Sequence, residues 1–115
     1  MAALGREGLM AALALRSEDV TLKGGGIVRV RTMTAGERIA LGTSCVDENG
    51  KIESGKFSSR LVAACVVDED GVRIFSDEDA AALLGGASDV FEAIFAASQR
   101  INGMGIDAVE AAKGN

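Results

Sequence analysis

The segment Val66–Asp79, written VVDEDGVRIFSDED, constrains the fold most strongly, because it places six acidic residues around a short apolar run. Gly71 supplies the positive φ that a tight hairpin turn needs, and β-prone residues flank the turn on both sides. Ser76 stands at the position of a helix N-cap, with Asp77–Asp79 in the first turn, where their charge opposes the helix dipole. The segment therefore predicts a β-hairpin that leads into a short helix over Ala80–Leu84.

The same acidic residues raise the question of a calcium site. Asp68–Gly71 provides only a fragment of an EF-hand loop, which needs oxygen ligands through its ninth position and a glutamate at its twelfth. The chain contains no histidine, the commonest general base and transition-metal ligand. Ser44–Cys45 and Ser58–Ser59 therefore have no imidazole to activate them. We expect no metal, no cofactor and no enzymatic activity.

The first third of the chain predicts an N-terminal helix and a second hairpin. Leu9–Leu15 is alanine-rich and apolar, which favours a short helix within an N-terminal arm over residues 1–16. Asp19–Met33 contains two runs of β-prone residues interrupted by Gly24–Gly26, a pattern typical of two strands joined by a glycine turn. Because no helix start follows these glycines directly, a hairpin turn fits them better than a phosphate-binding loop.

Capping and periodicity predict the remaining helices. Thr34 and Glu37 match a capping box that begins a helix at Ala35 and runs to Cys45. In chain order there follow a turn at Asp47–Gly50, a polar loop over Lys51–Lys56, a helix over Phe57–Cys65, and a helix over Val90–Ile101 capped by Ser88. The sequence thus predicts an α+β fold in one compact domain over residues 1–115, with four or five short helices on two small antiparallel β-hairpins, and a tail over residues 106–115 that frays.

Composition limits the partners. Twelve basic against seventeen acidic residues give a formal net charge of −5, and the basic residues are scattered singly, which argues against nucleic-acid binding. No apolar run approaches the roughly 20 residues that span a bilayer, and no signal peptide is recognisable, so we expect a soluble, cytoplasmic protein. Cys45 and Cys65 are expected to be reduced, partly buried thiols. The four Phe residues should dominate a thin core.

The helix over Val90–Ile101 carries the candidate binding surface. Phe91, Ile94, Phe95 and Ile101 recur at helical spacing and form the largest apolar concentration in the chain. Two interpretations stay open: the face is the core side of the helix, or it lines part of a groove for a partner. On the N-terminal helix, Leu9 and Leu13 are candidate contacts if that helix is a docking arm.

Three stretches of the chain are informative when taken together: Val28–Arg38 (VRVRTMTAGER), Phe57–Asp79 (FSSRLVAACVVDEDGVRIFSDED) and Phe91–Gly103 (FEAIFAASQRING). In this order they resemble the tail assembly chaperones of long-tailed, noncontractile bacteriophages and prophages. Met10–Val20 is also similar, so the resemblance covers nearly the whole chain. Each stretch alone is an ordinary capping or hairpin pattern, and their order and spacing carry the resemblance.

The resemblance implies a function. Such a protein binds the long, aggregation-prone tape measure protein in the host bacterial cytoplasm, keeps it soluble and promotes polymerisation of the tail tube around it, but is absent from the mature virion. A longer form, made by ribosomal frameshifting, engages the tail tube protein, and the end of this chain, Ala112–Asn115, fits the short form. Self-association is also expected. The alternatives are a structural head-tail or tube component, or a small acidic adaptor.

Overall fold

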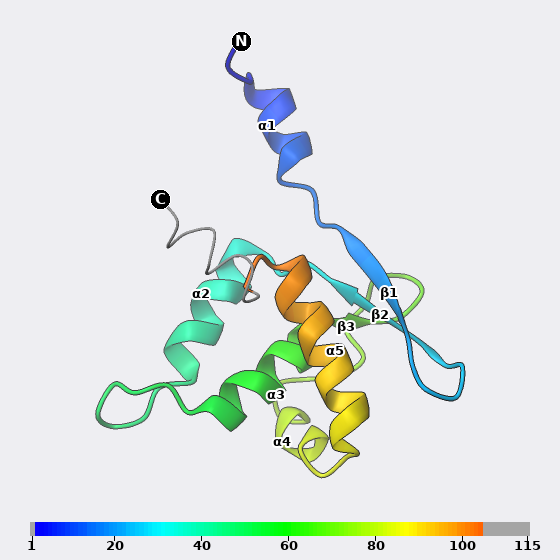
Figure 1. Cartoon of the computed structure of the whole chain (residues 1–115). Coiled ribbons are helices and arrows are strands. Elements are labelled where there is room, and N and C mark those ends of the chain that lie inside the picture. Colours follow the sequence, from blue (N-terminus) through cyan, green and yellow to red (C-terminus); the bar gives the residue numbers. More distant parts are fainter. Residues whose placement is uncertain (1, 105–115) are drawn as a thin grey trace, which may run out of the picture.

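The computed structural model describes residues 2–104, which form five helices and a three-stranded antiparallel sheet (Figure 1). In chain order the elements are α1 (Arg6–Ala12), β1 (Ser17–Thr21), β2 (Ile27–Arg31), α2 (Ala35–Ser44), α3 (Ser54–Cys65), β3 (Val66–Val67), α4 (Ala80–Leu83) and α5 (Ser88–Ile101). The predicted α+β class is confirmed. The predicted tail over residues 106–115 lies outside the described residues. No helix among residues 2–104 has both the length and the apolar character needed to cross a membrane.

The hairpin predicted over Asp19–Met33 is confirmed. β1 and β2 pair antiparallel in the register Ser17↔Arg31 to Thr21↔Ile27. Gly24 takes a φ of 96° in the connecting turn, a value that side chains other than hydrogen rarely allow. β3 then joins the other edge of β2, so the sheet order is β1-β2-β3.

Of the hairpin predicted in Val66–Phe75, only the turn is present. Gly71 has a φ of 80°, as predicted, but Val72–Phe75 forms no strand and makes only the bridge Val67↔Arg73. Val66–Val67 pairs instead with β2, and Phe75 leaves the sheet to pack against the hydrophobic core. Burial of this side chain thus overrides the β propensity of the segment.

Two turns of the chain share one hydrogen-bond pattern, which accounts for one aspartate in each turn. Asp68 Oδ1 accepts the backbone N–H of Asp70 at 2.8 Å and of Val72 at 3.0 Å. Asp47 Oδ1 accepts the N–H of the residues two and four positions on, at 2.8 and 2.9 Å. In the described part of the chain, no group of three or more Cys, Asp or Glu side chains is placed to hold a metal ion. Turn chemistry is therefore sufficient for these carboxylates.

One helix start is as predicted, and three others differ from the prediction. The capping box at the start of α2 is present, with Thr34 and Glu37 each bonded to the other's backbone N–H. The predicted loop over Lys51–Lys56 is wrong in its second half, because α3 begins at Ser54, where a bridge between residues 46 and 52 has already turned the chain. The N-cap of α5 is Ala87, so the predicted cap Ser88 is the first helical residue.

The third difference concerns α4. Ser76 Oγ accepts the N–H of Asp79 at 3.3 Å, and the Asp79 carboxylate accepts the N–H of Ser76 at 2.9 Å. This reciprocal pair closes a turn before the helix, and the helix itself begins at Ala80. Ser76 thus caps the turn that leads into α4 instead of the helix.

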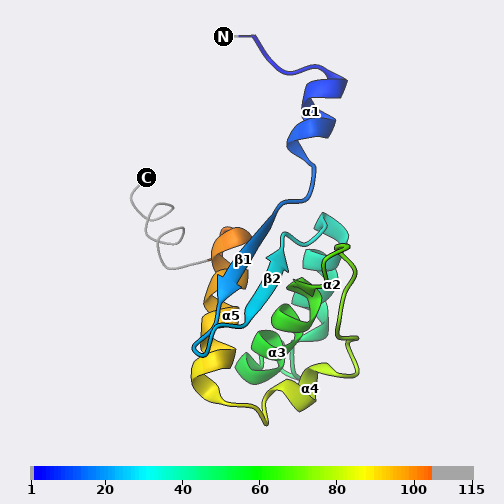
Figure 2. The same cartoon turned by 90° about the vertical axis from the view of Figure 1, so that its right-hand side faces the viewer.

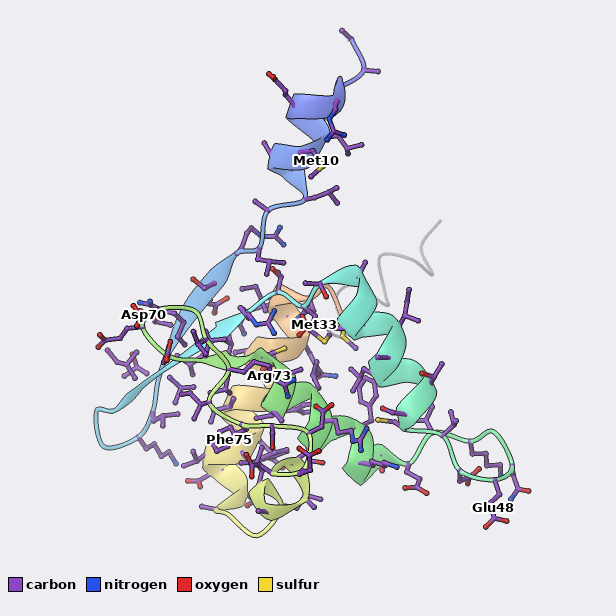
Figure 3. All side chains as sticks on the ribbon, turned by 180° about the vertical axis from the view of Figure 1, so that it is seen from behind. Met10, Met33, Glu48, Asp70, Arg73 and Phe75 are labelled. Atoms are coloured by element: carbon purple, nitrogen blue, oxygen red, sulfur yellow. The ribbon has the colours of Figure 1, made fainter. Side chains whose placement is uncertain are left out.

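The core lies between the sheet, α3 and α5 (Figure 2). Its buried members are largely aliphatic: Val30, Met33, Leu41, Cys45, Leu61, Val62, Ala64, Cys65, Val66 and Ala97. The prediction of a core dominated by Phe is wrong in detail, because all four Phe side chains are only partly buried and surround it. Both thiols are free and fully buried, more than predicted. Figure 3 shows Met33 within this body, whereas Met10 projects from it on α1.

Asn102, just after α5, ties the helix end to the sheet. Its Oδ1 accepts the N–H of Met33 at 2.8 Å, and its Nδ2 donates to the carbonyl of Ser98 at 2.9 Å. Nδ2 also lies 3.4 Å from the carbonyl oxygen of Arg31 and from Cys65 Sγ. This clasp fixes α5 along the sheet and so sets one wall of the groove described next.

Candidate functional site

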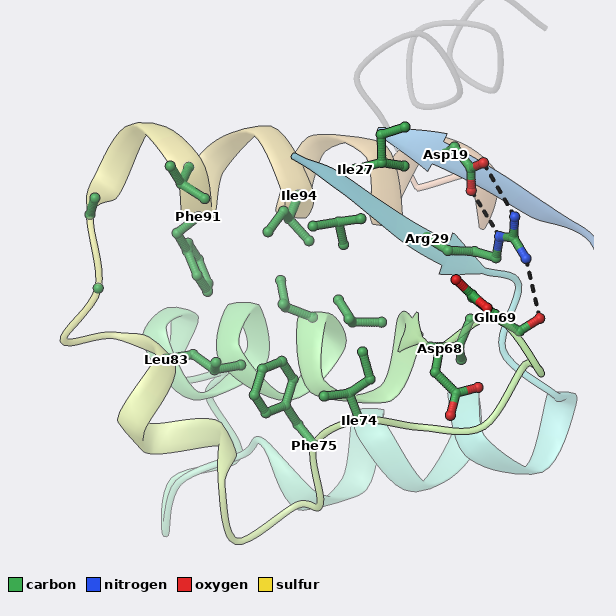
Figure 4. Close-up of a pocket in the computed structure, with 17 residues that line it drawn as sticks. Asp19, Ile27, Arg29, Asp68, Glu69, Ile74, Phe75, Leu83, Phe91 and Ile94 are labelled. Carbon is green, nitrogen blue, oxygen red and sulfur yellow. Dashed lines mark hydrogen bonds and ion pairs between the residues drawn. The ribbon is translucent and has the colours of Figure 1, made fainter. Parts of the chain in front are cut away.

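A large apolar groove opens between α5 and the segment from Ile74 to α4 (Figure 4). Its volume is about 760 Å³, within the range of ordinary ligand sites. The lining residues are Asp19, Ile27, Val28, Arg29, Val62, Val66, Val67, Asp68, Glu69, Ile74, Phe75, Leu83, Gly86, Ala87, Val90, Phe91 and Ile94. Six of the eight secondary-structure elements thus supply lining residues. Only the rim at one end of the groove is charged.

Two walls face each other across the groove. Phe91 and Ile94 project from α5 on one side, and Phe75 and Leu83 project from the opposite side (Figure 4). The ring of Phe91 is held by stacking on Phe95, with centroids 6.2 Å apart and an interplanar angle of 15°. The floor consists of buried valines of α3 and β3. This arrangement offers a concave apolar surface to side chains from outside.

One end of the groove is acidic. Arg29 donates to both carboxylate oxygens of Asp19, at 2.8 and 3.3 Å, and this hydrogen-bonded partner lowers the pKa of Asp19. Arg29 reaches Glu69 only at its backbone carbonyl, at 3.4 Å. Asp68 uses its carboxylate in the adjacent turn. Three acidic side chains against one basic side chain leave this rim with a formal charge of −2.

The groove is apolar apart from its charged rim. Its walls carry hydrocarbon side chains, and the chain has no histidine. Burial raises the pKa of the Cys65 thiol to about 11, so this cysteine is held in its unreactive form at neutral pH. The arrangement fits the apolar face of a helix, whose side chains at positions i, i+3 and i+4 enter such a groove together.

The structure separates the predicted binding residues into three groups. Phe91 and Ile94 line the groove. Phe95 and Ile101 lie on the same helix but pack against the core outside the lining. The residues Leu9 and Leu13 lie at α1, exposed and away from the groove.

Sequence reasoning missed the opposite wall. Ile74 and Phe75 were predicted as strand residues of a hairpin, and Leu83 as part of a minor helix. Ile74 and Phe75 form an apolar pair directly before Ser76, and this pair lies too close to a turn for a long strand. Only the path of the chain across α3 brings them opposite α5.

The fold can be compared with known structures. The solved structure of the bacteriophage HK97 tail assembly chaperone matches this fold with a TM-score of 0.56 and 16% sequence identity, over 85% of this chain and 100% of that chain. The fold resembles that of a phage tail assembly chaperone. This agrees with the resemblance noted in the sequence. No protein-family model matches the sequence, and a search of curated proteins finds no match.

Proposed function

We propose that this protein is a phage tail assembly chaperone that binds the tape measure protein, keeps it soluble and promotes tail tube polymerisation around it. The observation that carries the proposal is the apolar groove between α5 and the Ile74–Leu83 side, found in a fold that resembles the HK97 tail assembly chaperone. A client helix would place its apolar side chains between Phe91 and Phe75.

The physical properties of the chain support a holding function. A long apolar client aggregates through the same side chains that a groove can cover, so covering them in turn keeps the client in solution. The formal net charge of −5 would help to keep the complex dispersed. The groove offers no group suited to bond making or breaking, so we propose binding without catalysis.

The wider role follows the same proposal. The protein acts in the host bacterial cytoplasm and leaves before the virion is complete. A longer frameshifted form would bring in the tail tube protein. No nucleic acid or membrane takes part.

Co-expression with the long reading frame next to this gene tests the proposal. We expect that long product to stay in the supernatant and to co-purify with the wild-type chain. Ile74→Asp should abolish this rescue, because it introduces a charge into the groove at a side chain that is already 54% exposed and therefore tolerates the change in the folded state. Ile39→Asp is the matched control, since Ile39 is 69% exposed on α2 and lies outside the groove.

Two results would contradict the proposal. If the long product stays insoluble when both forms of this protein are supplied, the holding function is wrong. If this chain is instead a stoichiometric component of purified particles, it is a structural protein of the head-tail region or tube. Circular dichroism of both variants confirms that they are folded.

A further inference from the structure

The two ends of the groove differ in chemistry. At one end, beside Phe91 and Leu83, the lining side chains are hydrocarbons (Figure 4). At the other end lie Asp68 and Glu69, in the segment that follows β3 (Figure 4). A ligand that lies along the groove therefore meets hydrocarbon over most of its length and negative charge at one end.

The arginine of the rim does not neutralise these two carboxylates. Arg29 is bonded to both carboxylate oxygens of Asp19, and it reaches Glu69 only at the backbone carbonyl. Within residues 2–104, neither Asp68 nor Glu69 forms an ion pair. The Arg29–Asp19 pair is neutral as a whole, so the formal charge of −2 at the rim comes from carboxylates that are open to a cation from outside.

Glu69 is the freer of the two carboxylates. Asp68 Oδ1 already accepts two backbone N–H groups of its own turn. Glu69 is exposed, and within the described part of the chain its only hydrogen bond is the one at its backbone carbonyl. Its side chain can therefore turn toward a ligand that lies over the rim.

Exposed hydrocarbon continues up to this rim. Ile27 is 66% exposed and Ile74 is 54% exposed, and both line the groove. The hydrocarbon stem of a lysine or arginine covers such side chains while its charged head stays in contact with water or a carboxylate. A purely apolar ligand over the rim would instead remove water from the carboxylates and supply no cation, which costs free energy. The rim thus discriminates against a ligand that is apolar throughout.

We propose that the groove selects helices in which a lysine or arginine follows the apolar stripe, with the stripe between Phe91 and Phe75 and the basic side chain at Glu69. The basic residue would lie about one to two helical turns beyond the apolar anchors. This inference rests on the proposed function, because it names the kind of client segment that the groove holds. Since the charges meet at a partly exposed rim, they contribute to selectivity and orientation more than to affinity.

Fluorescence anisotropy with two synthetic helical peptides and the purified full chain tests the inference. Both peptides carry leucines at positions i, i+3, i+4 and i+7 of an alanine- and glutamine-based helix. Lysines follow the leucines in one peptide, and glutamines take their place in the other. The lysine peptide should bind about two- to fivefold more tightly at low salt, the range for partly exposed charge pairs. This preference should vanish at about 1 M salt, where the screening length is about 3 Å.

Two matched variants locate the charge that is responsible. Glu69→Gln should reduce the preference for lysine. Glu48→Gln should keep it in full, because Glu48 is equally classed as exposed but lies on a turn far from Phe75 and outside the groove (Figure 3). Each change raises the formal net charge of −5 by one. Ile74→Asp should abolish binding of the glutamine peptide, which shows that the peptide occupies the groove.

Three results would overturn the inference. One is equal binding of the two peptides by the wild type, and another is failure of both peptides to bind. The third is the same loss of preference in Glu69→Gln and Glu48→Gln, because the net charge and not the rim would then be responsible. The co-expression test decides the proposed function separately: if it fails while the rim-dependent preference for lysine is present, only the proposed function is refuted.

Discussion

The ion pair between Arg31 and Glu37 connects elements that support the groove. Arg31 donates from its two terminal nitrogens to the two carboxylate oxygens of Glu37, at 2.9 and 2.7 Å. It also donates to the carbonyl of Ala64 at 2.9 Å. The Arg31 side chain is 11% exposed and that of Glu37 is 29% exposed. The pair thus joins β2, α2 and α3 in a partly dry environment.

The magnitude follows from the pKa of Glu37. The hydrogen bond from Arg31 is the main reason that this pKa falls from its ordinary value of 4.5 to about 2; burial opposes the shift, and the Thr34 hydrogen bond assists it. At full value such a shift corresponds to about 3 kcal/mol. Because Glu37 is partly open to solvent, we expect about 1–2 kcal/mol.

The sign of the pH dependence is fixed by the direction of that shift. The folded-state pKa is lower than the unfolded one, so the carboxylate of Glu37 stabilises the fold above pH 4.5. This contribution is lost as the pH falls from 4.5 toward about 2, where the folded protein also takes up the proton.

The perturbation is Glu37→Gln, which keeps the size of the side chain and an oxygen for the Thr34 N–H but removes the charge. Urea unfolding, followed by circular dichroism at several pH values, measures the free energy of unfolding. We expect a loss of about 1–2 kcal/mol at pH 7, because the Arg31 charge loses its partner. The difference from wild type should shrink as the pH falls from 4.5 to 2.

Asp19→Asn is the matched control, because it breaks the exposed pair with Arg29 and should have a smaller effect at pH 7. Two results would refute the reasoning about Glu37. One is a stability equal to wild type at pH 7, and the other is a deficit that stays constant down to pH 2.

Three further predictions concern single residues, each with its own measurement. Gly71→Ala should lower the free energy of unfolding by about 1–2 kcal/mol, because Gly71 has a φ of 80°. Gly42→Ala, inside α2 with open space around the new Cβ, should instead raise this free energy by about 0.5–1 kcal/mol. Equal effects of the two changes in urea unfolding would contradict the turn geometry. Asn102→Ala removes the acceptor for the Met33 N–H and should cost about 1–3 kcal/mol in the same assay, and a neutral result would argue against the clasp. Burial raises the pKa of Cys65 to about 11, so alkylation followed by mass spectrometry should label this thiol only under unfolding conditions.

Local chemistry explains which parts of the fold were predictable. The capping box of Thr34 and Glu37, and the positive φ of Gly71, depend on residues within a few positions of each other, and both predictions are confirmed. The fate of Val72–Phe75 depends instead on distant residues, because Val66–Val67 pairs with β2 and Phe75 packs against the hydrophobic core. A single sequence carries no direct record of these contacts.

Only one wall of the candidate site was predictable, for the same reason. Helical periodicity identified Phe91 and Ile94, which belong to one continuous face of α5. The facing wall comes from a loop and a four-residue helix, where Phe75 and Leu83 show no period of their own. The clasp of Asn102 was also missed, because its partners lie up to 71 positions away in the chain.

Site-specific photocrosslinking tests the central claim, that the groove holds the client, most directly. A photoreactive amino acid replaces Ile74 in the groove or Ile39 on the outer side of α2, and each variant is co-expressed with the adjacent long reading frame. We predict a covalent adduct with the long protein from position 74 and none from position 39. Equal adducts from both positions, or an adduct from position 39 alone, would contradict the assignment of the groove as the client site.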